Sequence, residues 1–217
     1  MNEKIYKYEG KDIVVEYSLK RCIHAAECVK GLPNVFDPNK KPWIEPDAAS
    51  ADELAAIIER CPTGALHYQR LDGGEPEATP AQNNIRIGED DCLYLHGDFE
   101  ISIQGETVRD TRLALCRCGL SNNKPFCDNS HQKGDFKDVG AIGKTGAAVD
   151  RSESTGLVAL TLAENGPILI KGEVEIQNAE GEKSIHVSKG ALCRCGASAN
   201  TPFCDGAHKD IDFEATS

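Results

Sequence analysis

The chain has 217 residues, of which 40% are hydrophobic and 27% charged, and its formal net charge is −11. This length suits two average domains, or one domain followed by a duplicated module. No apolar run approaches the roughly 18 residues that a membrane-spanning helix needs, and the charged N-terminal segment lacks the apolar stretch of a signal peptide. The negative charge favours partners with basic patches, or serves solubility alone. We therefore expect a cytoplasmic protein that binds neither nucleic acid nor membranes.

In the N-terminal third, the pattern from Asp12 to Tyr17 predicts a strand that leads to Cys22. A helix follows, with a capping box at its start, apolar residues at helical spacing, and a proline after its end. The residues of this pattern are Ser50, Glu53, Leu54, Ile57, Ile58, Cys61 and Pro62. The turn-rich polar segment from Leu71 to Pro80 predicts a linker.

Strand patterns dominate the remainder of the chain. They cover residues 92–103, 107–118, 157–162, 167–176 and 183–195. Within the first of them, Gly97-Asp98 is a turn signal. The small-residue segment 140–148 lacks the spacing of a phosphate-binding loop, so we interpret it as a connection between the strand groups.

Ten cysteines are the most informative part of the composition. Because cytosolic thiols stay reduced, a disulfide framework is not expected here, and cysteines grouped at short spacings predict metal ligands. Nine of them fall into three groups, Cys22/Cys28/Cys61, Cys116/Cys118/Cys127 and Cys193/Cys195/Cys204. The tenth, Cys92, lies in an apolar run and is interpreted as a buried core thiol.

The second and third cysteine groups belong to an internal repeat. The repeated pairs are Leu115-Cys116-Arg117-Cys118-Gly119 with Leu192-Cys193-Arg194-Cys195-Gly196, Pro125-Phe126-Cys127-Asp128 with Pro202-Phe203-Cys204-Asp205, and His131 with His208. Every pair has the same offset of 77 residues. A constant offset at four candidate ligands and their neighbours indicates a duplication.

The spacing within each copy fits two metal ions. Residues two apart in a strand share a face, so Cys116 and Cys118 can bind one iron while Arg117 points to the other side. Residues four apart on a helix are neighbours, so Cys127 and His131 can bind a second iron from one helical turn, which the aspartate after Cys127 can cap. The pattern predicts a 2Fe–2S site. Structural zinc, which also accepts three cysteines and a histidine, is the alternative, although zinc sites usually use Cys-x₂₋₄-Cys.

Both copies resemble the CDGSH iron–sulfur domain, the mitoNEET family, whose pattern is Cys-x-Cys-x₂-Ser/Thr-x₃-Pro-x-Cys-Asp-Gly-Ser/Ala/Thr-His. The second copy matches throughout, and the first has Asn129 in place of glycine, a residue that tolerates a positive φ. The resemblance implies a 2Fe–2S cluster in each copy, with His131 and His208 as the single, exposed nitrogen ligands. It also implies a monomer with a pseudo-two-fold β-sandwich, because one chain carries both halves of the family's dimer.

The N-terminal cysteines resemble the ligands of single-cluster bacterial ferredoxins, whose pattern is Cys-x₂-Cys-x₂-Cys…Cys-Pro. The matching residues are Cys22, Cys28, Cys61-Pro62 and the segment Pro33-Asn34-Val35-Phe36. Ala25 occupies the second ligand position. The resemblance implies a 3Fe–4S cluster on the three cysteines, or a 4Fe–4S cluster with one iron held by His24, water or another donor. The alternative is a packed fold in which Cys61 completes the apolar face of its helix.

We therefore expect an α+β protein with a ferredoxin-like domain over 1–70, a linker over 71–84, a CDGSH repeat over 85–139, a connection over 140–156, and a second repeat over 157–217. The expected function is electron transfer or redox sensing with redox partner proteins. No nucleophile–base pattern or substrate motif indicates an enzyme. A carrier that donates clusters to apo-proteins and a zinc-stabilised interaction module are the alternatives.

Overall fold

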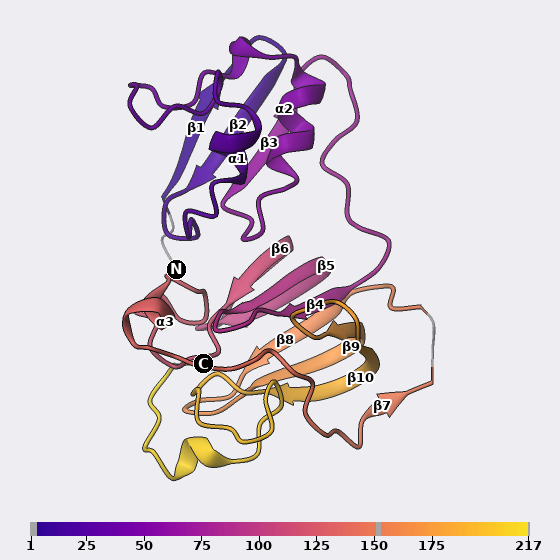
Figure 1. Cartoon of the computed structure of the whole chain (residues 1–217). Coiled ribbons are helices and arrows are strands. Elements are labelled where there is room, and N and C mark those ends of the chain that lie inside the picture. The colour runs from indigo at the N-terminus through magenta and orange to yellow at the C-terminus, as the bar shows by residue number, and fades with distance from the viewer. Residues whose placement is uncertain (1–3, 151–152, 217) are drawn as a thin grey trace. The chain divides into compact units, whose positions relative to one another are not determined.

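The computed structural model describes residues 4–150 and 153–216 (Figure 1). It is an α+β structure, in which strands predominate and the helices are short. The chain divides into two compact units between Ala78 and Thr79, inside the segment 71–84. No helix among the described residues has both the length and the apolar character needed to cross a membrane.

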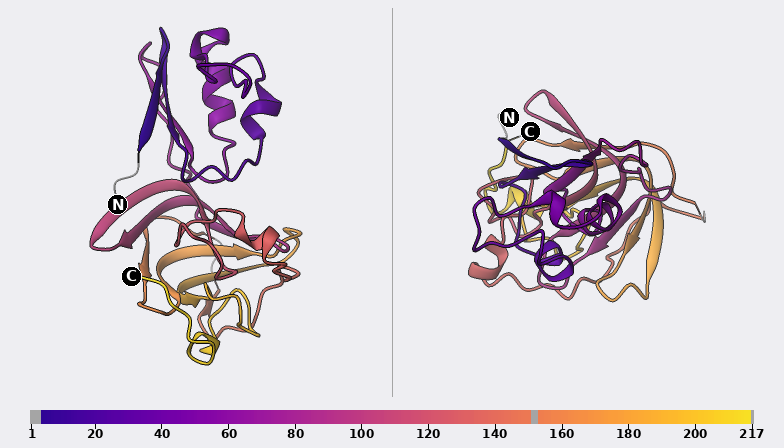
Figure 2. Two further views of the ribbon diagram at one scale, coloured as in Figure 1. Left: turned by 90° about the vertical axis from the view of Figure 1, so that its left-hand side faces the viewer. Right: turned by 90° about the horizontal axis from the view of Figure 1, so that it is seen from above.

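The N-terminal unit is an antiparallel sheet with its helices on one face (Figure 2, left). Its elements are β1 (Ile5–Glu9), β2 (Ile13–Ser18), α1 (Glu27–Gly31), η1 (Pro46–Ala48), α2 (Ala51–Ile58) and β3 (Leu66–Arg70), and the strand order is β1-β2-β3. Alternating residues of β2 turn inward, and Val15 is fully buried against Phe36, Leu54 and Ile58. This packing fixes the helices on the sheet. It thereby positions the first cysteine group, whose members lie in α1 or just after β2 and α2.

The predicted capping box opens α2: the Ser50 hydroxyl accepts a hydrogen bond from the Glu53 amide (3.3 Å), and the Glu53 carboxylate accepts one from the Ser50 amide (3.1 Å). The helix ends at Ile58, earlier than its sequence pattern predicts. The amides of Arg60 and Cys61 donate to carbonyls three residues back (3.2 and 2.9 Å), which tightens the last turn. Cys61 therefore lies outside the helix.

The C-terminal unit is a seven-stranded sheet. Its elements are β4 (Asn84–Ile87), β5 (Leu93–Ile103), β6 (Glu106–Leu115), α3 (Ser130–Lys133), β7 (Ala148–Val149), β8 (Val158–Leu162), β9 (Ile168–Gln177), β10 (Ser184–Leu192) and η2 (Ala207–Lys209). β4 pairs with both β5 and β9, and β8 lies between those two strands. β4 and β8 thus both lie between β5 and β9, each beside a different half of those strands, and apolar residues such as Leu95, Phe99 and Ile176 form the core of this unit.

β5 runs without a break through Gly97-Asp98, so the turn predicted there is wrong. The pairing of β5 with β6 shifts register at this point, which marks a β-bulge. Gly97 has φ 151°, and a side chain on it would collide with Asn83. The chain reverses instead at Gln104-Gly105, where both residues have positive φ.

The two ligand segments of the repeats touch each other. Cys118 and Cys195 form an antiparallel bridge. A Cβ atom placed on Gly119 would lie 2.5 Å from the Cys195 carbonyl oxygen, and one on Gly196 would lie 2.5 Å from that of Cys118. Both glycines have positive φ (79° and 81°). The repeats thus make reciprocal backbone contacts that leave no room for a larger residue.

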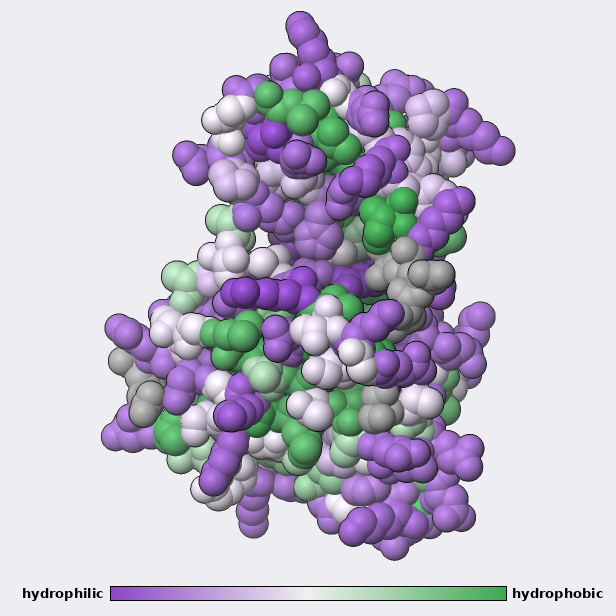
Figure 3. Space-filling model, turned by 180° about the vertical axis from the view of Figure 1, so that it is seen from behind, coloured by the Kyte–Doolittle hydropathy of each residue, from purple (hydrophilic) through white to green (hydrophobic). Residues whose placement is uncertain are grey.

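Hydrophilic side chains predominate on the face in Figure 3, and hydrophobic atoms form separate patches among them. The large exposed apolar residues in the described part of the chain are Ile5, Leu19, Leu71, Leu120, Val139, Leu157, Leu169 and Ile211. Single exposed apolar residues are normal on a soluble protein. The net charge of −11 agrees with such a surface.

Candidate metal centres

The first repeat brings its four predicted donors together. Cys116 and Cys118 follow β6, and their sulfur atoms are 3.6 Å apart. The sulfur of Cys127 lies 3.5 Å from Nδ1 of His131. All four side chains are buried, so the exposure expected for His131 is wrong. The four line a pocket of about 180 Å³.

The second repeat has the same arrangement. The sulfur atoms of Cys193 and Cys195 are 3.5 Å apart, and the sulfur of Cys204 lies 3.4 Å from Nδ1 of His208. Cys193 and Cys195 are buried, whereas Cys204 and His208 are half-buried. The second pair of donors is therefore more open to solvent than its counterpart in the first repeat.

Backbone hydrogen bonds hold the two halves of each site together. The Cys116 amide donates to the Pro125 carbonyl (2.8 Å), and the Cys127 amide donates to the Ala114 carbonyl (2.9 Å). The matching bonds of the second repeat are Cys193 to Pro202 (2.7 Å) and Cys204 to Ala191 (2.8 Å). Each loop between the donor pairs is therefore folded back onto the strand that ends at the Cys-x-Cys motif.

The arginine between the first two cysteines points away from the donors, as predicted. Arg117 donates from Nε to the Asp91 carbonyl (2.7 Å) and forms an ion pair with Asp138 (2.9 Å). Arg194 donates from Nε to the Gly166 carbonyl (2.6 Å) and from Nη2 to the Ala163 carbonyl (2.6 Å). These bonds tie each ligand segment to the chain just before β5 or β9.

The third cysteine does not share a helical turn with its histidine, so this prediction is wrong. α3 begins at Ser130, after Asn129 with φ 67°, and η2 begins after Gly206 with φ 98°. A left-handed residue redirects the chain before the helix. The Asp128 carboxylate accepts from the Ser130 amide (3.0 Å), the predicted cap, and the Asn129 amide donates to the Cys127 sulfur (3.4 Å).

The surroundings of the Cys-x-Cys pair favour negative charge on one of its two sulfur atoms, that of Cys116, whereas the hydrogen bond with Cys116 and burial raise the pKa of Cys118. A hydrogen bond from Cys118 lowers the pKa of the Cys116 thiol, and the backbone amides of Gly119 and Ser121 act in the same direction. The Leu120 amide donates to the Cys118 sulfur (3.5 Å). Thiolates that receive amide hydrogen bonds, joined by one imidazole, are a donor set that fits iron–sulfur coordination.

Sequence reasoning missed a polar group at the first site. Asp91 Oδ1 lies 3.2 Å from His131 Nε2, and the donor atoms of Asp91, Cys127 and His131 all lie within 4.8 Å of one another. Cys92 is buried, as predicted, but it lines the donor pocket. A hydrogen bond with Cys127, together with burial, raises the pKa of the Cys92 thiol. No sequence pattern marks Asp91 as a neighbour of His131, because the contact joins segments 40 positions apart.

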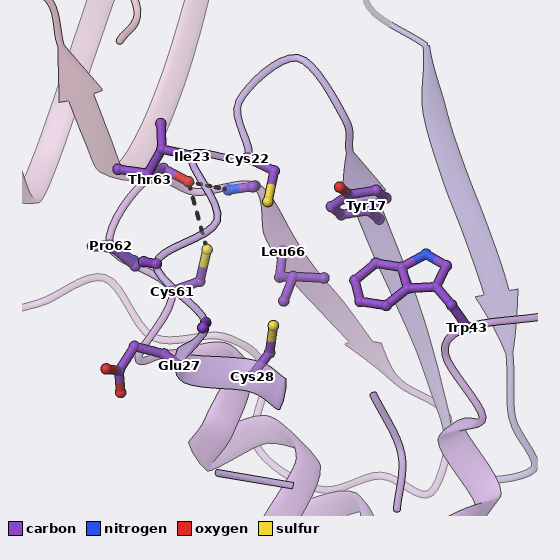
Figure 4. Close-up of a pocket in the computed structure, with 13 residues that line it drawn as sticks. Tyr17, Cys22, Ile23, Glu27, Cys28, Trp43, Cys61, Pro62, Thr63 and Leu66 are labelled. Atoms are coloured by element: carbon purple, nitrogen blue, oxygen red, sulfur yellow. Dashed lines mark hydrogen bonds between the residues drawn. The ribbon is translucent and has the colours of Figure 1, made fainter. Parts of the chain in front are cut away.

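The three N-terminal cysteines face a common space (Figure 4). Cys22 follows β2, Cys28 lies in α1, and Cys61 follows α2. They line a pocket of about 360 Å³, whose apolar wall includes Ile23, Trp43 and Leu66. The Thr63 hydroxyl lies 3.6 Å from the Cys61 sulfur and accepts a hydrogen bond from the Ala65 amide (3.2 Å).

Two other residues of the predicted ligand loop take different places. Ala25 lines the cysteine pocket, whereas His24 is exposed and lines a neighbouring groove beside Trp43. Burial raises the pKa of Cys28 to about 11, so this thiol keeps its proton at neutral pH until a metal displaces it. Burial, followed by the neighbouring Cys22 thiol, raises the pKa of the Tyr17 hydroxyl. The pocket thus offers three sulfur donors and one position without a thiol.

Comparison with known proteins agrees with these donor sets. Residues 8–71 match the family model described as a divergent 4Fe-4S mono-cluster, and residues 90–132 and 165–209 match that described as an iron-binding zinc finger, CDGSH type. These two parts of the chain match the two families. Its N-terminal part is 37% identical over 62 residues to the uncharacterized protein YjdI of Escherichia coli strain K12, which covers 29% of this chain and 82% of YjdI. The YjdI of strain O157:H7 matches equally well, and no solved structure matches the chain.

Proposed function

We propose that the chain is an electron-transfer or redox-sensing protein with one 2Fe–2S cluster in each CDGSH repeat. The donor grouping carries this proposal. Donors of one zinc ion lie within about 4 Å of each other, because zinc–ligand bonds are only about 2.0–2.3 Å long. Among the described residues, Cys116 and Cys118 are not part of the tight group around Cys127 and His131. Two separate pairs support two metal ions. A bound cluster supplies one-electron chemistry.

The N-terminal unit is proposed to hold a 3Fe–4S or 4Fe–4S cluster on Cys22, Cys28 and Cys61. Three sulfur donors from separate segments of this unit face one pocket (Figure 4). The wall beside the sulfur atoms is largely apolar, and Ala25 leaves one ligand position without a thiol. The helices on one face of a small sheet support a ferredoxin-like fold for this unit.

The reciprocal contacts between the repeats support a pseudo-two-fold β-sandwich and a monomer. Gly119 packs on the Cys195 carbonyl as Gly196 packs on that of Cys118, so each repeat supplies the other with the same backbone surface. A homodimer would obtain such contacts from two subunits. The proposed protein is cytoplasmic and not an enzyme, and its negative charge suits redox partners with basic patches.

A second candidate function is that of a carrier that donates iron–sulfur clusters to apo-proteins. The half-buried positions of Cys204 and His208 favour it, because exposed donors give an acceptor access to the metal. Incubation of the loaded protein with an apo-ferredoxin distinguishes the two functions. A carrier builds the acceptor's spectrum as its own declines, whereas an electron-transfer protein keeps its clusters.

The deciding experiment is iron and sulfide analysis, with EPR spectroscopy, on protein purified without oxygen. We expect seven or eight irons per chain if all three sites are filled, since two 2Fe–2S clusters contribute four and the N-terminal cluster three or four. Four irons would restrict the clusters to the two repeats. A colourless protein that contains zinc and no sulfide would contradict the proposal and favour a zinc-stabilised interaction module.

A further inference from the structure

The backbone shows which residues of the two repeats are equivalent just before β5 and β9. The Gly88 amide donates to the Cys92 carbonyl (2.9 Å), and the Ala163 amide donates to the Pro167 carbonyl (2.9 Å). The buried arginines repeat this match, since Arg117 binds the Asp91 carbonyl where Arg194 binds that of Gly166. Asp91 and Cys92 therefore correspond to Gly166 and Pro167.

The offset here is 75 residues, against 77 at the ligands, because the hairpin between β9 and β10 is longer than that between β5 and β6. A comparison at constant offset pairs Asp91 with Ile168 and misses the equivalence. The pairing Tyr94–Ala114 in the first repeat likewise matches Leu169–Ala191 in the second.

Asp91 fixes the orientation of the His131 ring. Its Oδ1 atom lies 3.2 Å from Nε2, while Nδ1 faces the Cys127 sulfur. The Tyr94 hydroxyl donates to the other carboxylate oxygen (2.7 Å) and holds the carboxylate in place. Because a carboxylate only accepts, the ring hydrogen lies on Nε2 and the lone pair of Nδ1 is left for a metal.

Cys92 covers Cys127, the other donor of the Cys127–His131 pair, from solvent. Its side chain is 1% exposed and lines the donor pocket together with Cys127. With this cover, Cys127 is 3% and His131 5% exposed. At the equivalent positions, Gly166 and Pro167 offer no polar side chain. No carboxylate pairs with His208 in the part of the chain that the structure describes.

We propose that Asp91 and Cys92 make the first repeat the site that retains its metal, and that the second repeat is the site that exchanges it. This inference rests on the proposed 2Fe–2S clusters in both repeats. Carboxylates that orient a metal-bound histidine typically contribute 10–100-fold to metal affinity. Asp91 is thus a positioning residue for His131, and the two repeats differ in retention although their ligands are identical.

The test follows iron release from the full-length loaded protein into a chelator, under nitrogen and at one fixed pH. We expect the four irons of the repeats to leave in two phases. Asp91→Gly should accelerate the slow phase about tenfold, whereas Asp91→Asn, which keeps an acceptor oxygen, should change it less than about threefold. The double variant Gly166→Asp/Pro167→Cys should slow the fast phase. Gly166 has no positive φ, and a Cβ there lies 3.1 Å from that of Ala163, so the exchange requires little adjustment.

A spectroscopic readout separates orientation of the ring from a loss of folding. The nitrogen hyperfine coupling in the EPR spectrum of the reduced protein should change for one of the two clusters in Asp91→Gly and return in Asp91→Asn. A single phase of iron release in the wild type, or an unchanged slow phase in Asp91→Gly, overturns the inference. If the protein still contains iron and sulfide, the proposed clusters stand and only the inference about retention fails. A protein with zinc and no sulfide overturns the proposed function, and this inference with it.

Discussion

Arg194 is a buried cation, and its replacement by methionine tests how the ligand segment of the second repeat is held. The side chain is 2% exposed. Its guanidinium donates to the carbonyls of Gly166 and Ala163 (both 2.6 Å) and, at longer range, to those of Ala215 (3.2 Å) and Thr216 (3.1 Å). Methionine fills a similar volume but donates no hydrogen bond, so all four carbonyls lose their charged partner.

The two shortest hydrogen bonds of Arg194 determine how much stability the substitution removes. A hydrogen bond from a charged donor contributes about 1.5–3 kcal/mol, so losing the bonds to Gly166 and Ala163 costs about 3–6 kcal/mol. Burial lowers the pKa of Arg194, which shows that burying the charge has its own cost, and methionine removes that cost. We expect Arg194→Met to lower the free energy of unfolding by about 3 kcal/mol, and the melting temperature by about 10 °C.

The assay is thermal unfolding of metal-free protein followed by circular dichroism, because bound metal would add its own stabilisation. Lys189→Met on β10 is the matched control, since Lys189 is exposed and its replacement should change stability by less than about 0.5 kcal/mol. If Arg194→Met melts within about 2 °C of the control, the hydrogen bonds to the carbonyls do not hold the ligand segment and the reasoning fails.

Further changes test the sites themselves. Ala25→Cys should give a stable 4Fe–4S cluster, because residue 25 lines the pocket of the three cysteines; an unchanged EPR spectrum would count against the ferredoxin-like site. Gly206 has φ 98°, a conformation that strains a β-branched residue more than asparagine. Gly206→Val should therefore lower the free energy of unfolding by about 2 kcal/mol, and Gly206→Asn by less than about 1 kcal/mol. Equal urea midpoints for the two variants would refute this. Hydrogen bonds from the backbone amides of Ala207 and Ala199 lower the pKa of Asp205 in the folded protein. The ionised Asp205 therefore stabilises the fold above its ordinary pKa of about 4, and this stabilisation is lost as the pH falls through the lowered pKa. Asp205→Asn should weaken the acid dependence of metal-free stability between about pH 2 and 5. His208→Cys should lower one reduction potential, since a thiolate adds negative charge; redox titration checks this.

Local patterns in the sequence determined the donors and several elements. The candidate donors lie in short segments whose spacing reflects their chemistry. The constant offset of 77 residues between equivalent donors marks the duplication. The capping box of Ser50 and Glu53 is equally local, because its hydrogen bonds join residues three apart. The same holds for the positive φ of Asn129, where glycine stands in the second repeat.

Tertiary structure alone decided what surrounds those donors. Asp91 reaches His131 across 40 positions of sequence, and it does so because Arg117 anchors the Asp91 carbonyl beside the ligand loop. The bulge at Gly97 depends on the close approach of Asn83, and β4 pairs with β9 across about 90 positions of sequence. Such contacts arise from packing between distant segments, which no spacing within one segment encodes. For that reason the two repeats have identical ligands in sequence but different surroundings in the folded protein.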